Sequence, residues 1–303
     1  ISWCHCIQNE DGADYQVGGR GTFSNSLFAY SSDDGIDLNS AIELTITHCT
    51  ITENSDDGIE FRLYPYVGPL LRLDVIDNRF IHNDSDGIQL IDSPDSSSRL
   101  IRIERNLFTT NRKATVGCMP DQRTDEDFSA AALLEKVQFV NNTVVGDGYG
   151  LSGGANLVAV NNVFMNVVNK VFRKVIGPNS IAAHNLVWNN GATNDSSNVD
   201  AGTTISADPL LAADYHLTAG SPAIDAGVAS YLWRGEDVVN LPPTGYSGSA
   251  PDLGAYEFNG NAPVARNDTT QVVTGGSVSV AAPGVLGNDT DPNLDPLTVV
   301  GAT

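Results

Sequence analysis

Asp33-Asp34-Gly35-Ile36-Asp37-Leu38 is the stretch that decides the fold, because close variants of it recur along the chain. The variants are Glu10-Asp11-Gly12-Ala13-Asp14-Tyr15, Asp56-Asp57-Gly58-Ile59-Glu60-Phe61 and Ser85-Asp86-Gly87-Ile88-Gln89-Leu90. Their glycines follow one another at intervals of 23, 23 and 29 residues. A period of this length is typical of a solenoid, in which each repeat forms one coil stacked on the last.

Each copy of the phrase also predicts its own local structure. Asp-Gly favours a turn, since glycine reaches backbone conformations that other residues avoid. The residues after it alternate between apolar and polar, as a short strand does. Acidic side chains at equivalent points of successive coils must then lie about 4.8 Å apart. The sequence therefore predicts a ladder of carboxylates along one side of the molecule.

A second column of residues supports the repeat. Short strands end in a small or amide residue that is followed two positions later by an apolar one, with the central positions at Cys49, Asn78, Asn106, Asn142, Asn162 and Asn185. Asparagine accepts left-handed turns, and its side-chain amide can bond along a stack. We expect the five asparagines to form one buried or half-buried column at a turn between sheets. Together with the absence of helical periodicity, this indicates an all-β fold, a right-handed parallel β-helix.

The pattern of Asn-x-apolar followed by Asp-Gly-Ile-x-apolar resembles the β-helix repeat of the pectin-lyase-like superfamily, over roughly residues 1–200. That superfamily includes lyases, hydrolases, epimerases, phage tailspikes and non-catalytic surface proteins. The resemblance therefore predicts the fold and leaves the activity open.

The domain organisation follows from where the repeat stops. Residues 1–205 are expected to form the β-helix, with upstream coils and a secretion signal missing because the chain opens at Ile1 inside a strand pattern. Residues 206–258 resemble the terminal segment of many bacterial secreted β-helices and are expected to cap the last coil without chemistry of their own. A linker at 259–264 precedes residues 265–303, which resemble the opening of a bacterial cadherin-like or immunoglobulin-like module.

Composition excludes several partners. The 303 residues include 37 acidic and 16 basic ones, a formal charge of −21. Such a charge argues against nucleic acid and anionic membranes, and it suits divalent cations and an extracellular setting. No apolar run is long enough to span a membrane. The four cysteines are expected to be free thiols: Cys4, Cys6, Cys49 and Cys118.

Three insertions interrupt the coils at residues 62–72, 92–99 and 112–135, each just after the strand that follows an Asp-Gly turn. They should emerge on the same side, either as tolerated surface loops or as walls of a binding groove. Aromatic and basic residues in or near them are candidates for substrate binding: Tyr64, Tyr66, Arg72, Arg79 and Lys113.

The acidic ladder has three competing interpretations. Its aspartates serve only as turn residues, or they bind calcium through Asp34, Asp37, Asp57 and Glu60. In the third interpretation, Asp34 and Asp57 resemble the paired aspartates of polygalacturonase-type glycosidases, one acting as acid and the other activating water. A separate calcium site is expected in the C-terminal module at Asp289, Asp291 and Asp295.

The resemblance to those glycosidases is incomplete. Their Gly-His-Gly and Arg-x-Lys phrases are absent here, and His82 is the nearest histidine. A lyase would instead need a cation to acidify the proton beside a uronate carboxylate, and a basic residue such as Arg62, Arg79 or Lys113 as the base.

The sequence thus predicts a bacterial secreted or cell-surface β-helix protein that binds an extracellular polysaccharide along an acidic, loop-flanked groove, with Ca²⁺ as the ion. If it processes the polymer, it acts as a lyase, a hydrolase or an epimerase. The alternative is a non-catalytic adhesin or structural stalk.

Overall fold

The computed structural model describes residues 1–16, 18–92, 98–120, 133–258, 265–269, 275–276 and 284–289. The chain divides into two compact units, Ile1–Glu257 and Phe258–Thr303. In the second unit a short 3₁₀ helix, η1 (Gly284–Leu286), is followed by Asp289, whose carboxylate accepts the backbone N–H of Arg266 at 2.7 Å. The expected calcium ligands Asp291 and Asp295 lie outside the described residues.

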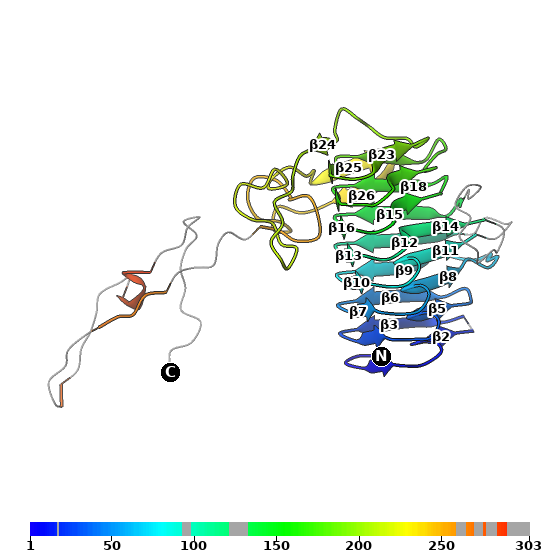
Figure 1. Ribbon diagram of the computed structural model, residues 1–303, viewed down its shortest axis with the longest axis horizontal. Coiled ribbons are helices and arrows are strands. Elements are labelled where there is room, and N and C mark those ends of the chain that lie inside the picture. The colour runs from blue at the N-terminus through cyan, green and yellow to red at the C-terminus, as the bar shows by residue number, and fades with distance from the viewer. Residues whose placement is uncertain are drawn as a thin grey trace. The chain divides into compact units, whose positions relative to one another are not determined.

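The first unit is a right-handed parallel β-helix, as predicted, with three sheets running along its length (Figure 1). Sheet A contains β3 (Arg20–Ser24), β6 (Glu43–Thr47), β9 (Leu71–Ile76), β12 (Arg99–Glu104), β15 (Lys136–Val140), β18 (Leu157–Val160) and β21 (Ile181–Ala183). Sheet B contains β1 (His5–Ile7), β4 (Leu27–Ala29), β7 (Thr50–Thr52), β10 (Arg79–Ile81), β13 (Leu107–Thr109), β16 (Thr143–Val145), β19 (Val163–Met165), β22 (Leu186–Trp188) and β24 (Ile205–Ser206). Sheet C contains β2 (Asp14–Tyr15), β5 (Ile36–Leu38), β8 (Ile59–Arg62), β11 (Ile88–Ile91), β14 (Ala114–Met119), β17 (Tyr149–Ser152), β20 (Lys170–Arg173) and β23 (Ala192–Asp195).

Each coil passes through the sheets in the order A, B, C, and its inward side chains fill a continuous core. Phenylalanines stack along this core, with ring centroids 4.6 Å apart for Phe80 and Phe108 and 5.8 Å apart for Phe108 and Phe139. A buried phenylalanine contributes about 1.5–3 kcal/mol of transfer free energy, and paired rings add to it. The stack therefore joins successive coils energetically as well as spatially.

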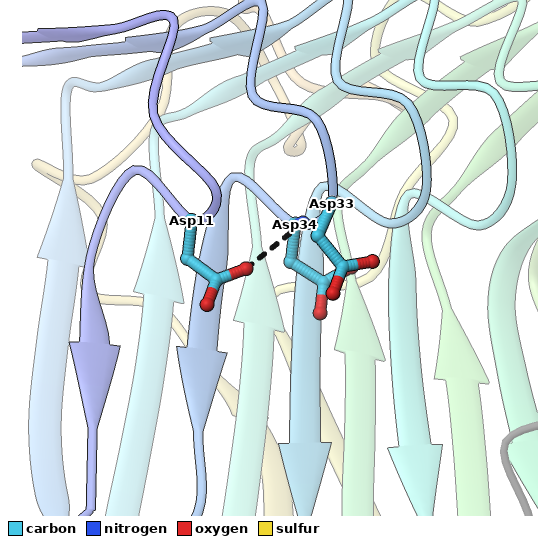
Figure 2. Close-up of side chains that lie close together, drawn as sticks. All are labelled: Asp11, Asp33 and Asp34. Carbon is cyan, nitrogen blue, oxygen red and sulfur yellow. Dashed lines mark hydrogen bonds between the residues drawn. The ribbon is translucent and has the colours of Figure 1, made fainter.

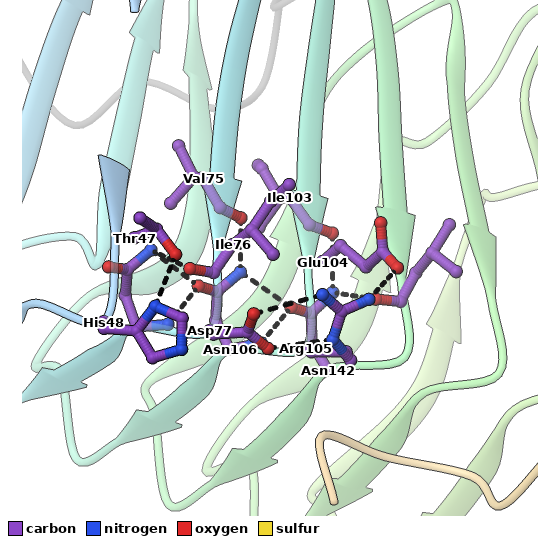
Figure 3. A network of polar contacts seen from close by, with 12 residues as sticks. Thr47, His48, Val75, Ile76, Asp77, Ile103, Glu104, Arg105, Asn106 and Asn142 are labelled. Carbon is purple, nitrogen blue, oxygen red and sulfur yellow. Dashed lines mark hydrogen bonds and ion pairs between the residues drawn. The ribbon is translucent and has the colours of Figure 1, made fainter. Parts of the chain in front are cut away.

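The predicted asparagine column stands at the turn between sheets A and B. The side-chain oxygen of each asparagine accepts both the backbone N–H and the side-chain amide of the preceding one, from Asn78 through Asn106, Asn142 and Asn162 to Asn185. All five are fully buried. Figure 3 shows Asn106 and Asn142 in this ladder, with Arg105 turned outward to Asp77 and Glu104.

One detail of this turn differs from the prediction. The positive φ belongs to the residue before each ladder position, such as Asp77 (59°) and Asn141 (53°), and not to the ladder asparagines. The left-handed residue makes the bend, which leaves the next side chain pointing inward to bond along the stack.

A second, unpredicted ladder occupies the turn between sheets B and C. Its members are Asn54, Asn83, Asn111 and Asp147, and each accepts the backbone N–H of the one before it. The four cysteines are free thiols, as expected.

Residues 206–258 lie differently from the expected cap. Their hairpin of β25 (Ser230–Trp233) and β26 (Glu236–Asn240) packs against the outer side of β15 and β18 through Val238 and Val239 (Figure 1). Asn161 fixes the segment by bonding both backbone groups of Val228, at 3.0 and 2.9 Å. The reason is that β15 and β18 carry valines on their outer face, which need cover from water. No helix among the described residues is long and apolar enough to cross a membrane.

Candidate functional site

The aspartates of the repeated phrase form an inner ladder at the entrance to sheet C. The backbone N–H groups of Asp34, Asp57, Asp86 and Ala114 donate to the carboxylates of Asp11, Asp34, Asp57 and Asp86, over 3.2, 2.9, 2.7 and 2.6 Å. The glycine after each aspartate permits this close stacking. A Cβ on Gly58 would lie 2.5 Å from the carbonyl oxygen of Gly87, nearer than any ordinary contact.

This ladder contradicts the glycosidase interpretation of Asp34 and Asp57. Asp57 is 1% exposed, and its pKa lies well above its ordinary value because burial disfavours the charged form and because Asp86 and Asp34 repel it. A carboxyl that is buried to this degree is not accessible to a glycosidic bond. Asp57 is also absent from the carboxylate groups that converge in the described part of the chain.

A second set of acids lies on the outer face of sheet C. Asp14, Asp37, Glu60 and Gln89 occupy one cross-strand column, since β2, β5, β8 and β11 pair in that register. Carboxylate oxygens of this column and of the turn converge within 4.8 Å of one another in three overlapping groups. We call the union of these groups the acidic cluster: Asp11, Asp14, Asp33, Asp34, Asp37 and Glu60. Figure 2 shows Asp11, Asp33 and Asp34 converging at the turn.

The cluster is electrostatically strained. Burial raises the pKa of Asp34 to about 9 and that of Asp37 to about 7, and in both cases the charge of Glu60 adds to the shift. One carboxylate oxygen of Asp37 is buried without a hydrogen-bond partner among the described residues, as is the side-chain oxygen of Gln89 beside Glu60. Three converging carboxylates, one of them with a buried oxygen that lacks a donor, fit a hard divalent cation such as Ca²⁺, which takes six to eight oxygen ligands. The residues present therefore fit the predicted ion at Asp34, Asp37 and Glu60, and Asp11, Asp14 and Asp33 form two neighbouring groups that share Asp34 or Asp37 with it.

Arg62 brings a positive charge to the edge of the acidic cluster. Its guanidinium contacts Glu60 at 2.7 Å. Burial lowers the pKa of Arg62, but the charge and hydrogen bond of Glu60 outweigh burial, so the net pKa is raised. Arg62 and Tyr64 line a cavity of about 70 Å³ together with Ile91 and Asp92. A permanent cation at this place suits binding an anion better than accepting a proton.

The other predicted site residues are scattered. Arg72 lies on β9 of sheet A, and Arg79 on β10 of sheet B, so neither shares the face that carries the acidic cluster. His82 follows β10 at the turn between sheets B and C, where it lines a separate hollow with Asp84 and Arg112. Lys113 precedes β14 and donates its N–H to Ser85.

The insertions do leave the helix at one corner, between sheets C and A, after β8, β11 and β14. Tyr66 lies there, with its ring centroid 6.0 Å from the guanidinium of Arg99. Arg99 in turn joins two insertions, since it contacts Glu135 at 3.8 Å and donates to the backbone oxygen of Tyr64 at 2.7 Å. Sequence reasoning missed this link because no local pattern pairs two residues from different insertions.

Comparison with protein families gives a match to the family described as "Right handed beta helix region", over residues 1–207. Among solved structures, the crystal structure of pectate lyase Pel9A aligns with a TM-score of 0.55 and 19% sequence identity, covering 84% of this chain and 70% of that one. At this identity the likeness concerns the fold alone. Comparison with curated protein sequences gave no significant match. Since the family match spans more than half of the 303 residues, this chain belongs to the right-handed β-helix family.

Proposed function

We propose that this protein binds an acidic extracellular polysaccharide on the outer face of sheet C, through a calcium ion held by the acidic cluster. The observation that carries the proposal is the convergence of the Asp34, Asp37 and Glu60 carboxylates at the outer edge of sheet C, next to two overlapping acidic groups and to the Arg62 guanidinium on Glu60. An extracellular or cell-surface location is part of the same proposal, and the charge of −21 is compatible with it.

The ion would be held by Asp34, Asp37 and Glu60, and the two overlapping groups with Asp11, Asp14 and Asp33 lie next to it. When bound, calcium neutralises the repulsion within the cluster and offers open coordination positions to the carboxylates of a uronate polymer. A neutral polysaccharide has no such group, so the proposal predicts selectivity for uronates.

The chain's own residues supply the rest of the binding surface. Arg62 can pair with a uronate carboxylate one sugar away from the ion, because it extends from β8 next to Glu60. The Tyr64 ring lies in the same small cavity and offers an apolar face to a sugar ring. Tyr64 and Tyr66, in the insertion after β8, would border the bound polymer at this edge of sheet C.

Cleavage of the polymer by β-elimination is the second candidate, and the position of a basic residue next to the acidic cluster favours it. Arg62, in its neutral form, would then remove the proton beside the uronate carboxylate, the glycosidic C–O bond at the next carbon would break, and the leaving oxygen would take a proton from water. Its pairing with Glu60 opposes the loss of its own proton, so we place binding ahead of cleavage. In the adhesin or stalk alternative, the protein binds without forming products.

The test measures binding of polygalacturonate, alginate and a neutral β-glucan, each in calcium and in EDTA. Unsaturated products and reducing ends are followed in the same samples. We expect calcium-dependent binding of a uronate polymer that Asp37→Asn weakens about tenfold or more. Asp84→Asn is the matched control, because Asp84 is an exposed aspartate outside the cluster. Equal binding in calcium and EDTA, or equal loss in both variants, would refute the proposal.

A further inference from the structure

The packing of residues 206–258 against the side of the β-helix leaves a cavity that is separate from the acidic cluster. The cavity lies between the outer face of sheet A and the hairpin of β25 and β26, and its volume is about 190 Å³. Sites that enclose a drug-sized molecule measure roughly 300–1,000 Å³, so this one has room for a single ring and its substituents. It is on a different sheet from the acidic cluster.

Trp233 forms the aromatic part of the lining, and its position is fixed on two sides. The indole N–H donates to the backbone oxygen of Asn179 at 2.7 Å, and the guanidinium of Arg234 lies 5.5 Å from the ring centroid. The ring also packs at the edge of the valine cluster that joins the hairpin to β15 and β18. An aromatic side chain held in this way loses little conformational entropy when a ligand stacks on it.

Polar groups complete the lining. Gln138 and Asn156 each donate an amide hydrogen to a backbone oxygen, of Asp237 at 3.3 Å and of Leu134 at 3.1 Å, which directs their side-chain oxygens to act as acceptors. Lys136 and Glu236 form an ion pair at 2.9 Å beside them. Charged groups make the stronger hydrogen bonds to neutral hydroxyls, and here both a donor and an acceptor are present.

We propose that this cavity is a second glycan-binding site, which holds one pyranose residue against Trp233. A pyranose has an apolar face of C–H groups and a rim of hydroxyls that both donate and accept. An indole surrounded by amides and by an ammonium–carboxylate pair matches both features. The lining contains no cluster of carboxylates, so the site binds without calcium, and it stands whether or not the acidic cluster holds an ion.

The test is done in EDTA, which separates this site from the acidic one. The probes are hexasaccharides of galacturonate, mannuronate, β-1,4-glucose, β-1,4-xylose and β-1,4-mannose, titrated into the full chain by calorimetry. The uronate and neutral probes distinguish an acidic from a neutral pyranose. We expect at least one probe to bind, and Trp233→Ala to weaken it by about tenfold or more, as central tryptophans do at binding surfaces.

Two further variants test whether the loss of binding is specific to the cavity. Asn156→Ala removes one acceptor without touching the hairpin, and it should weaken the same probe by about threefold or more. Trp188→Ala is the matched control, since Trp188 is a partly exposed tryptophan on sheet B, and it should leave binding unchanged. Absence of binding by every probe in EDTA, full binding by Trp233→Ala, or an equal loss in Trp188→Ala would overturn the proposal. Asp37→Asn should leave EDTA-resistant binding intact, so failure of the acidic site would show separately.

Discussion

Raising the pH in the absence of metal should destabilise the first unit, and calcium should offset a large part of this loss. The pKa of Asp34 is raised to about 9 and that of Asp37 to about 7, from an ordinary value of 3.8, first because both are buried. The folded state therefore holds protons that the unfolded chain releases above pH 4. The stabilisation that these protons give is present at low pH and is lost as the pH rises through the folded pKa values.

The size of the effect follows from the number of protons. One extra proton in the folded state lowers the free energy of unfolding by about 1.4 kcal/mol for each pH unit. Between pH 5 and pH 8, Asp34 alone sets an upper limit of about 4 kcal/mol. Asp37 is partly exposed and adds a smaller, solvent-screened part. Such a change is a large share of the 5–15 kcal/mol typical of a folded domain.

Calcium binds the ionised carboxylates, so its affinity rises over the same pH range. At a hundred times its dissociation constant it adds about 2.7 kcal/mol. The measurement is urea unfolding, followed by tryptophan fluorescence, at pH 5, 6, 7 and 8 in EDTA and in calcium. Asp37→Asn should flatten the slope in EDTA and reduce the gain from calcium. A free energy of unfolding that is flat or rising with pH in EDTA, or a gain from calcium that is no larger at pH 8 than at pH 5, would refute the reasoning.

Three other predictions concern the ladders and the binding face. Asn142→Ala leaves the backbone N–H of Asn106 and one of its two amide hydrogens without an acceptor, while the other amide hydrogen keeps Val75. At about 1–3 kcal/mol for each unsatisfied donor, the free energy of unfolding in urea titrations should fall by about 2–6 kcal/mol. Gly58→Ala places a Cβ 2.5 Å from a backbone oxygen and should lower the melting temperature by several degrees, whereas Gly19→Ala, which meets nothing within 4 Å, should not. Arg62→Gln should weaken uronate binding in calcium by about tenfold while leaving calcium affinity within a few-fold, and an unchanged affinity for the polymer would remove Arg62 from the binding face.

The fold could be predicted from the sequence because successive coils repeat the same pattern of turn and strand residues. The period of the Asp-Gly phrase gives the length of each coil, and the asparagine positions locate one of its turns. The ladder from Asn78 to Asn185 could therefore be predicted from the sequence alone. The ladder from Asn54 to Asp147 was missed because only Asn54 and Asn83 precede an Asp-Gly phrase by the same three residues. Ala114 replaces the phrase after Asn111, and the ladder ends in an aspartate. The lateral packing of residues 206–258 could have been predicted from the strand Leu157-Val158-Ala159-Val160. This strand is apolar on both faces, so its outer face needs a covering segment.

The site was harder to predict because one phrase carries two acids with different roles. Asp34 and Asp37 lie only three residues apart, yet Asp34 bonds along the inner ladder and Asp37 lies on the outer face of the sheet. Spacing alone could not tell which column is buried, and so Asp57, a purely internal residue, was paired with Asp34 as a catalyst. The link between Arg99 and Glu135 depends on two insertions meeting, which no repeat encodes.

The inner aspartate ladder and the outer column of sheet C also differ in how far their acids extend. This difference shows which acids the fold itself requires. The inner ladder keeps aspartate as far as Asp86, and then ends at Ala114. The outer column is acidic only as far as Glu60, and continues through Gln89 and Gly117 on strands that pair in unbroken register. Gln89 and Gly117 therefore show that the strand does not need an acid at the outer position. The carboxylates of Asp37 and Glu60 repel one another without serving the turn, and Arg62 offsets only part of this repulsion, which supports the proposal that a cation binds there.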